Sequence, residues 1–366
     1  MLDSTSLVPD DWSGLISRVA GDLDLDALAK ETRALVRRRG VPDAKALLRL
    51  ALARGPGGMS LRQTAAWAHL SGVADLTDAS LNDRLHQSCD FLAAIVAKLL
   101  AARAPSPCPR WPGRSLRIAD GSCVSKPGSR GTDWRVHGVY DLGAGGFSHL
   151  ELTDKHGGEA LDRGAGVEGE IRIADRGYSA AKALRRFVAS VKQAKGADYV
   201  VRLRWRSFRL RKPCGAKFDL IAHLQNMPKK QNIDDVRVLI EGAGDPLPTR
   251  IVIARKPEEA ARAERERLTR DARKKGKQLD PRSLISAEYV MLATSLPEDV
   301  YPASEILALY RLRWQIELAF KRLKTLQGID CLPAKTDKGG RSWICAHLIL
   351  AIATDACSQD FLDSSP

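Results

Sequence analysis

The sequence lacks the features that would place the protein in a membrane or outside the cell. No apolar run reaches the roughly 18 residues that a membrane-spanning helix needs. The N-terminus, MLDSTSLVPDDW, is acidic and polar, unlike a secretory signal. The seven cysteines are scattered and odd in number, and no two form a C-x-x-C pair. A disulfide framework and a zinc knuckle are both disfavoured, so we expect a reduced, cytoplasmic protein.

What the sequence has in excess is positive charge. Its 366 residues are enough for two or three domains, and 44% of them are hydrophobic and 28% charged, as is usual for a globular protein. The formal net charge, however, is +14. Such an excess of Lys and Arg indicates a polyanionic partner. Because no segment suits a membrane, we expect that partner to be nucleic acid.

Residues 1–104 have the pattern of an all-helical N-terminal domain. Leu25, Leu28 and Ala29 recur at helical spacing, and further helices are expected at 44–53, 61–69 and 81–86. Ser60 is placed to cap the helix at 61–69. Two short helices joined by the turn at 72–80 are typical of a DNA-binding helix-turn-helix, but a plain helical bundle gives the same pattern. Both interpretations stay open.

A proline-rich boundary at 105–113 separates these helices from an α/β region over 114–330. Short strands are expected at 114–119, 134–141, 147–152, 170–174 and 199–203, with a helix from 179 to about 195. An insertion over about 204–288 follows. It is β-rich to 255 and continues with a charged helix at 257–277. A strand at 289–293, one long helix from about 303 to 327, and a short C-terminal tail at 331–366 complete the chain.

Two short segments of the α/β region resemble each other. RIADG at 117–121 and RIADRG at 172–177 each end an apolar strand in an aspartate that lies close to a glycine. Asp120 and Asp175 could therefore face a shared crevice at the ends of their strands. Each aspartate taken alone is better explained as a turn former.

The long helix predicted at 303–327 changes that balance. At about 100° per residue, Tyr310, Arg313, Glu317 and Lys324 fall within roughly 60° of arc, separate from the apolar face. Pairing of Glu317 with its basic neighbours would be worth only about 0.3–0.5 kcal/mol per pair. Such pairing explains the charges, but it does not explain why Tyr310 and Lys324 share the same line.

These residues resemble a known family. Tyr310-x-x-Arg313-x-x-x-Glu317-x-x-x-x-x-x-Lys324 is similar to the YREK motif of IS-4-type (insertion sequence 4 family) DDE transposases, and Asp120 and Asp175 match that family's first two acidic residues. The resemblance covers about 114–330. It implies a ribonuclease-H-like catalytic core with a β-rich insertion. The implied activity is cut-and-paste transposition, with DNA cleavage at transposon ends and strand transfer into target DNA.

The resemblance also implies a site and its partners. Asp120, Asp175 and Glu317 would be catalytic and would hold two Mg²⁺ ions, for which Mn²⁺ can substitute. Tyr310, Arg313 and Lys324 would contact double-stranded DNA, on which the protein would act as a homodimer. Arg176 either holds a phosphate or forms a structural salt bridge. The implied partners are transposon ends and target DNA, and no membrane.

Some residues and activities stay open at this point. Trp205 and Trp314 could trap a flipped base, although packing is the favoured explanation for each. His137 is expected to be a core histidine or a neighbour of the site, not a metal ligand. The basic cluster at 202–212 is expected to bind DNA. Few residues follow the long helix, so the alternatives are an inactive or truncated transposase that only binds DNA, and a hydrolytic nuclease of the same fold.

Overall fold

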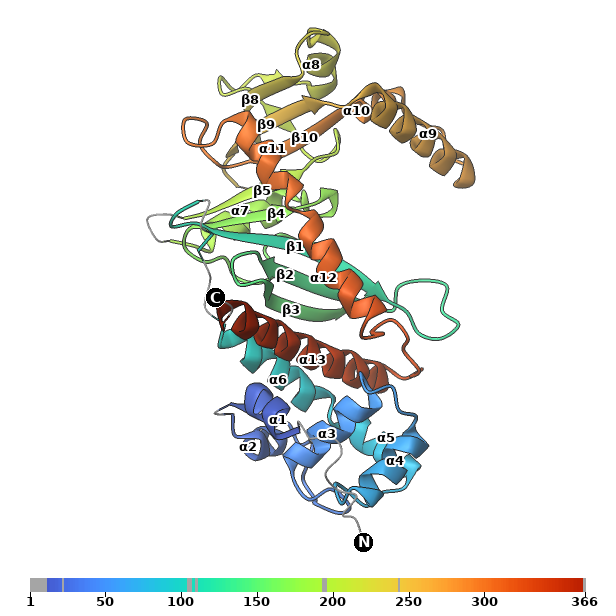
Figure 1. Cartoon of the computed structure of the whole chain (residues 1–366). Coiled ribbons are helices and arrows are strands. Elements are labelled where there is room, and N and C mark those ends of the chain that lie inside the picture. The colour runs from blue at the N-terminus through green and yellow to red at the C-terminus, as the bar shows by residue number, and fades with distance from the viewer. Residues whose placement is uncertain are drawn as a thin grey trace.

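The computed structural model describes residues 12–21, 23–103, 107–108, 111–192, 196–242 and 244–364. These residues form an elongated mixed α/β molecule with helices at one end and a large sheet above them (Figure 1). The predicted boundary at 105–113 lies partly outside the described residues. None of the described helices is both long and apolar enough to cross a membrane.

The described part of the N-terminal region is helical. Its elements are α1 (Trp12–Ala20), α2 (Leu25–Glu31), α3 (Ala44–Arg54), α4 (Leu61–Leu70), α5 (Asp78–Gln87) and α6 (Cys89–Ala101). Ser60 caps α4 as predicted, and it forms a reciprocal capping box with Gln63. Thr77 caps α5 in the same way that Asp43 caps α3. The α4–α5 pair therefore has fixed ends and a short connection, and the two helices pack together.

One continuous sheet holds all the strands that the described residues form. In spatial order it runs β3 (Gly146–Asp154), β2 (Trp134–Asp141), β1 (Ser115–Val124), β4 (Glu170–Ala174), β5 (Ala197–Arg202), β10 (Tyr289–Thr294), β9 (Leu247–Arg255), β8 (Ile233–Ile240), β6 (Leu210–Arg211) and β7 (Lys217–Phe218). Strands β1, β4 and β5 are parallel, and the other pairings are antiparallel. Strand β1 is longer than the 114–119 expected from the sequence.

Both faces of the central strands are covered, so apolar residues follow one another instead of alternating with polar ones. Ile118 and Ile173 pack on the face that carries α11 (Ala303–Arg311), α12 (Trp314–Thr325) and α13 (Asp337–Ser364). Their neighbours Ala119 and Ala174 pack on the opposite face against α7 (Ala181–Ala189). Because side chains alternate along a strand, the residue after each alanine turns back toward α11 and α12.

The insertion is less purely β than predicted and extends the sheet instead of forming a separate body. It contains α8 (Leu220–Asn226), α9 (Glu258–Lys274) and α10 (Pro281–Ala287) as well as strands. Strand β9 pairs with the whole length of β10, so the insertion lengthens the sheet beyond β5. The charged helix predicted at 257–277 is α9, which projects to the right of the sheet in Figure 1.

The single helix predicted at 303–327 is wrong, because it is two helices with a tight turn between them. The backbone amides of Leu312, Arg313 and Gln315 donate to carbonyl oxygens three residues earlier, not four. Such bonds close three-residue turns, and in these turns residues i and i+3 lie directly above one another. Tyr310 and Arg313 are therefore aligned by the turn itself.

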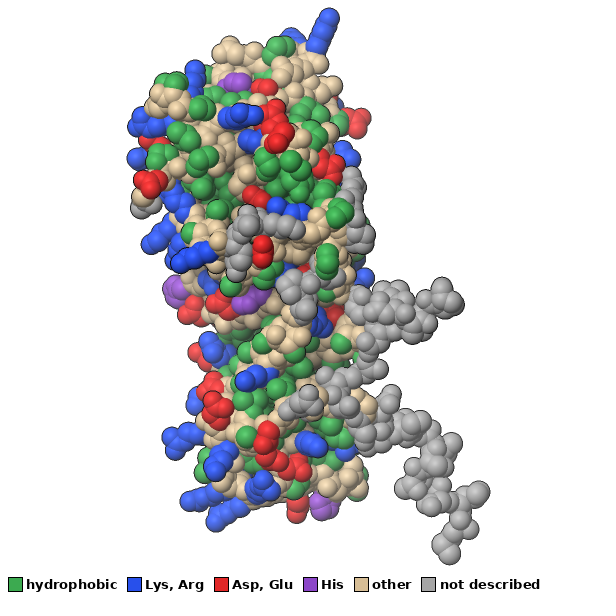
Figure 2. All heavy atoms as spheres, turned by 90° about the vertical axis from the view of Figure 1, so that its left-hand side faces the viewer, with side chains coloured by type: hydrophobic (Ala, Val, Ile, Leu, Met, Phe, Trp, Pro, Cys, Tyr) green, Lys and Arg blue, Asp and Glu red, His purple; other side chains and the backbone are tan. Residues whose placement is uncertain are grey.

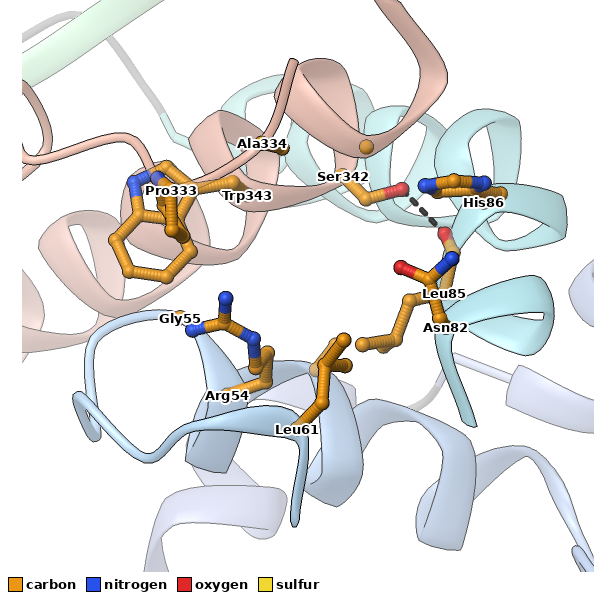
Figure 3. A pocket seen from close by; sticks show the side chains of 12 residues that line it. Arg54, Gly55, Leu61, Asn82, Leu85, His86, Pro333, Ala334, Ser342 and Trp343 are labelled. Atoms are coloured by element: carbon orange, nitrogen blue, oxygen red, sulfur yellow. Dashed lines mark hydrogen bonds between the residues drawn. The ribbon is translucent and has the colours of Figure 1, made fainter. Parts of the chain in front are cut away.

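The segment predicted as a short tail is mostly the long helix α13, which lies beside α6 (Figure 1). Its first turns lie against the helical end of the molecule, where the Ser342 hydroxyl donates to the Leu85 carbonyl (Figure 3). The Arg54 guanidinium lies 5.1 Å from the centre of the Trp343 ring. Arg103 also donates to the carbonyl oxygens of Phe147 and Ile352. The C-terminal segment thus joins the N-terminal helices to the sheet.

Candidate active site

Asp120 and Asp175 are brought together by strand pairing. Ala119 on β1 pairs in parallel register with Ala174 on β4, and each aspartate follows directly. Neighbouring strands lie about 4.8 Å apart, so the two carboxylates are close neighbours. Both turn toward the face that α11 and α12 cover, and α12 crosses β1 there. The two sequence segments that looked alike are therefore adjacent in space.

The Asp120 carboxyl holds its proton more tightly than an ordinary aspartate. Burial raises its pKa to about 6, and the nearby acidic groups Glu159 and Asp175 add to the shift. The Gly121 backbone amide, which donates to Oδ1 at 2.8 Å, and the Arg313 guanidinium oppose it. Asp120 is thus a carboxylate whose charge is only partly compensated by the protein around it.

The pKa of Asp175 is shifted in the opposite direction, toward the ionised form. Burial works to raise its pKa, but the Arg176 amide, the cations Arg202 and Arg313, and the Tyr310 hydroxyl together bring the pKa below its usual value. Tyr310 Oη donates to Asp175 Oδ1 at 3.1 Å, and Arg202 lies 4.0 Å from the same oxygen. Tyr310 therefore contacts the second aspartate, where the sequence had predicted a DNA contact.

Glu317 lies on the first turn of α12 and is engaged by Arg313. The Arg313 guanidinium donates to Glu317 Oε1 at 2.5 Å, and the glutamate side chain is 54% exposed. Arg313 itself is largely covered and also favours the ionised forms of Asp120 and Asp175. One guanidinium thus serves all three of the acidic residues that the sequence had grouped.

The donors in this group suit a hard divalent cation. Carboxylate oxygens are the ligands that such ions prefer, and a carboxylate with a raised pKa gains most from an added positive charge. Across the described ranges, however, no three His, Cys, Asp or Glu side chains gather closely enough to hold a metal ion. Arg313 supplies the positive charge instead, so its pairing with Glu317 would have to open for all three carboxylates to share an ion.

Sequence reasoning missed a fourth acidic side chain here, Glu159, in the connection between β3 and β4. A Cβ placed on Gly177 would lie 1.6 Å from Glu159 Oε2, so the carboxylate rests directly on that glycine. Tyr178 is only 2% exposed. Burial raises the pKa of its hydroxyl, and the charges of Asp120 and Glu159 raise it further. Gly177, two residues after Asp175, therefore leaves room for the Glu159 carboxylate in its present position, and the spacing of that glycine was the only clue in the sequence.

A basic cleft opens beside Asp175. It has a volume of about 580 Å³ and lies between the end of β5, α9 and α10. The cations that line it are Arg176, Arg202, Arg204, Arg206, Lys256 and Arg267. Arg176 lies 3.7 Å from Glu264 of α9, so one of the two roles that the sequence left open, an ion pair, is formed in this structure. Burial lowers the pKa of Lys256 and of Arg176, and neighbouring cations lower both further.

The aromatic candidates differ in accessibility. The guanidinium groups of Arg206 and Arg282 lie 4.5 and 4.4 Å from the centre of the Trp205 ring, and the Trp205 indole donates to Ser283. Trp205 is thus engaged by neighbouring side chains, whereas Trp314 is 49% exposed on α12.

Other predicted residues take structural positions. His137 is buried, its Nε2 lies 3.0 Å from Thr153 Oγ1, and burial lowers its pKa to about 4. It is a core histidine, as expected. In the cluster at 202–212, Arg206 pairs with Asp280 and Arg211 with Glu241, so part of that charge is already compensated. Lys324 is partly buried on the last turn of α12.

Comparison with known proteins gives two kinds of match. Residues 111–352 match the family model described as "Transposase DDE domain". InsL of insertion sequence element IS186A from Escherichia coli (strain K12) is 41% identical over 98% of this chain and 96% of its own length. The transposase for insertion sequence element IS421 from Escherichia coli shows the same identity and the same shares.

A more distant relative and a solved structure complete the comparison. The transposase for insertion sequence element IS231B from Bacillus thuringiensis subsp. berliner is 24% identical over 58% of this chain and 46% of its own length. A cryo-EM structure of a piggyBac transposase synaptic complex with hairpin DNA covers 95% of this chain and 66% of that chain. It is 9% identical, with a TM-score of 0.40, which is too low to argue from.

Proposed function

The chain belongs to the DDE transposase family, in its IS-4 type, and on that premise we propose that Asp120, Asp175 and Glu317 carry out its DNA cleavage and strand transfer. The observation that carries this proposal is the register of β1 and β4, which makes the two aspartates neighbours on the face that α12 covers. Arg313 links the third carboxylate to the same place.

The family works with divalent metal ions, and here the proposed cofactor is Mg²⁺, bound as two ions, with Mn²⁺ able to substitute. When bound, the ions would activate the attacking oxygen and stabilise the leaving oxygen. The protein's own contribution is to keep Asp175 ionised through Tyr310 and Arg202. It also keeps Asp120 in a partly buried place, where a cation is held strongly. Arg313 would release Glu317 as the metal takes over its role.

We also propose that the first five strands are a ribonuclease-H-like core. Their order, β3-β2-β1-β4-β5, combines an antiparallel meander with two further strands parallel to β1. Supporting this division, the insertion leaves the core after β5 and returns to it through β10 and α11. Residues 1–104, 114–330 and 331–366 would then be the N-terminal domain, the catalytic domain and the C-terminal segment.

DNA is the family's substrate, and we propose which residues of this chain contact it. Arg313 and Lys324 would hold phosphates beside the cut. Tyr310 and Arg176, which in this structure contact Asp175 and Glu264, would hold further phosphates there. A second cleft supports a DNA-binding role for the N-terminal helices, because Arg33, Arg37 and Arg39 line it together with α5 and the loop before it. Pairing of two copies on DNA, which the family resemblance supports, can be tested by light scattering with and without DNA.

The test of the catalytic assignment is substitution of each acid in turn. Asp120→Ala, Asp175→Ala and Glu317→Ala should each abolish strand cleavage in Mg²⁺ while DNA binding, measured by gel shift, persists on the basic surfaces. Asp330→Ala is the matched control, since Asp330 is exposed just after α12 and should leave cleavage intact. Cleavage near the wild-type rate in any of the three variants would refute the assignment of that residue.

Strand joining separates this function from its rivals. Incubation of wild-type protein with a pre-cut element end and a plasmid should give joined products. Nicks without joining would mean a hydrolytic nuclease of the same fold. DNA binding without cleavage or joining in Mg²⁺ or Mn²⁺ would mean a protein that only occupies element ends.

A further inference from the structure

Helix α9 projects from the sheet and has little of its surface buried. Of its 17 residues only Ala261 is buried, and the helix packs chiefly against α10. It projects to the right of the sheet in Figure 1, and its residues Glu264, Arg267 and Leu268 line the basic cleft. A polar helix of this kind depends for its stability on ion pairs along its length or on the elements that it connects.

The charges of α9 are distributed unevenly along its length. Near the sheet they are paired: Arg265 contacts Glu258 and Glu288, and Arg267 contacts Glu264 and Asp271. The Arg265–Glu288 and Arg176–Glu264 pairs join the helix to the wall of the cleft, whereas the other pairs lie within α9 itself.

The far end of α9 and the turn after it differ from this. They carry five exposed cations for which the described residues provide no ion pair: Arg270, Arg273, Lys274, Lys275 and Lys277. We call these five residues the basic tip. No acidic residue occurs between Asp271 and Asp280, so no carboxylate lies among the last four cations of the tip.

The ordinary explanation accounts for only part of this. Cations in the last turn of a helix stabilise its dipole by about 0.3–1 kcal/mol, which would explain one or two of them. It does not explain five cations, two of which lie beyond the helix, at the end of a projecting element. Figure 2 shows the side of the molecule that lies to the left in Figure 1, away from α9, and there Lys and Arg are interspersed with Asp and Glu.

We propose that α9 is an arm whose basic tip holds backbone phosphates of the DNA duplex lying in the active site. The proposal rests on the function above, because the arm begins at the cleft beside Asp175. From Arg267 in the cleft to Lys274 is seven residues, about 10.5 Å along a helix. That distance is about three base-pair steps of 3.4 Å each, so the tip reaches DNA beyond the nucleotides at the cut.

The contact is with phosphate, not with bases. Lys and Arg on the end of a helix present charge without a fixed pattern of base-reading groups, and phosphate contacts position DNA without carrying sequence information. The arm should therefore contribute equally to the affinity for an element end and for an unrelated duplex of the same length. This separates the arm from any part of the protein that recognises the element's own sequence.

The experiment compares two pairs of lysines, each pair formed by consecutive residues and carrying the same charge. Lys274→Gln/Lys275→Gln changes the basic tip, and Lys229→Gln/Lys230→Gln removes two equally exposed charges after α8. Binding of a fluorescein-labelled duplex of arbitrary sequence is titrated at several salt concentrations, in an Asp120→Ala background so that no DNA is cut. If both tip lysines contact phosphates, the slope of log K against log salt should fall by about 1.8, at about 0.9 per contact. The Lys229/Lys230 variant should keep the wild-type slope.

Duplex length provides a second measurement. For this measurement the duplex is an element end, which fixes the position of the cut. Shortening it beyond the cut by more than the reach of the arm should weaken binding by the Asp120→Ala protein and should leave the tip variant in the same background unaffected. If the tip and control variants have the same slope at every length, the arm does not bind DNA. That result would leave the catalytic proposal standing, because cleavage by the wild-type protein is measured separately. Conversely, a changed slope in a protein that never cleaves would refute only the catalytic proposal.

Discussion

Replacing Asp120 by asparagine should make the metal-free protein more stable. The folded protein raises the pKa of Asp120 from 3.8 to about 6, mainly through burial, so an ionised carboxylate at this position costs folding free energy. A shift of this size corresponds to about 3 kcal/mol at neutral pH, at about 1.4 kcal/mol per pKa unit. The asparagine side chain would carry no charge, and its amide oxygen could still accept from the Gly121 backbone amide.

The size of this stabilisation depends on pH in a defined way. Below about pH 4 the carboxyl is protonated in both states and costs nothing. Between about pH 4 and pH 6 the unfolded chain ionises while the folded protein keeps the proton, so stability is lost as the pH rises. Above about pH 6 the full penalty applies. The advantage of Asp120→Asn should therefore be complete at pH 8 and nearly absent at pH 4.

Thermal unfolding in EDTA measures this directly. An unfolding entropy of about 2.1 cal/mol/K per residue gives about 0.8 kcal/mol/K for the whole chain, so about 3 kcal/mol should raise Tm by about 4 °C. Asp175→Asn is the opposing control, because the lowered pKa of Asp175 means that its charge stabilises the fold and its loss should lower Tm. Adding Mg²⁺ should raise the Tm of the wild type more than that of Asp120→Asn. An unchanged or lower Tm for Asp120→Asn at pH 8, or an equal gain at pH 4, would refute this reasoning.

Two further predictions test the helix beside the site and the packing beneath it. Lys324→Ala should weaken binding to element ends and slow excision while leaving metal affinity unchanged, because Lys324 lies about 10.5 Å along α12 from Glu317; gel shift and calorimetry check the two parts, and a loss of metal affinity would contradict it. Gly138→Ala should lower the free energy of unfolding by about 1–3 kcal/mol, because its Cβ would lie 2.8 Å from the Phe147 ring. Urea denaturation measures this, and Gly131→Ala, where a Cβ meets open space, should behave as wild type.

The sequence by itself determined the local elements and the family. Strand periodicity placed β2 and β4 correctly, and Ser60 marked the start of α4. These features depend on neighbours a few residues away, which is the range over which propensity and capping act. The family followed from the spacing of Tyr310, Arg313, Glu317 and Lys324 together with two aspartates upstream. That motif is specific because four residue types must recur at fixed intervals downstream of both aspartates.

Only the tertiary structure decided which side chains lie close together and how readily the acidic ones ionise. Asp120 and Asp175 lie far apart in the sequence, and only the parallel register of β1 and β4 makes them neighbours. The three-residue turn before α12 depends on how α11 and α12 both pack on the sheet, so a helical wheel could not show it. The C-terminal segment has too little local pattern to reveal its partner, and it is fixed as α13 by contacts with distant residues of the N-terminal helices. Local sequence sets conformation, whereas long-range burial sets proximity and charge.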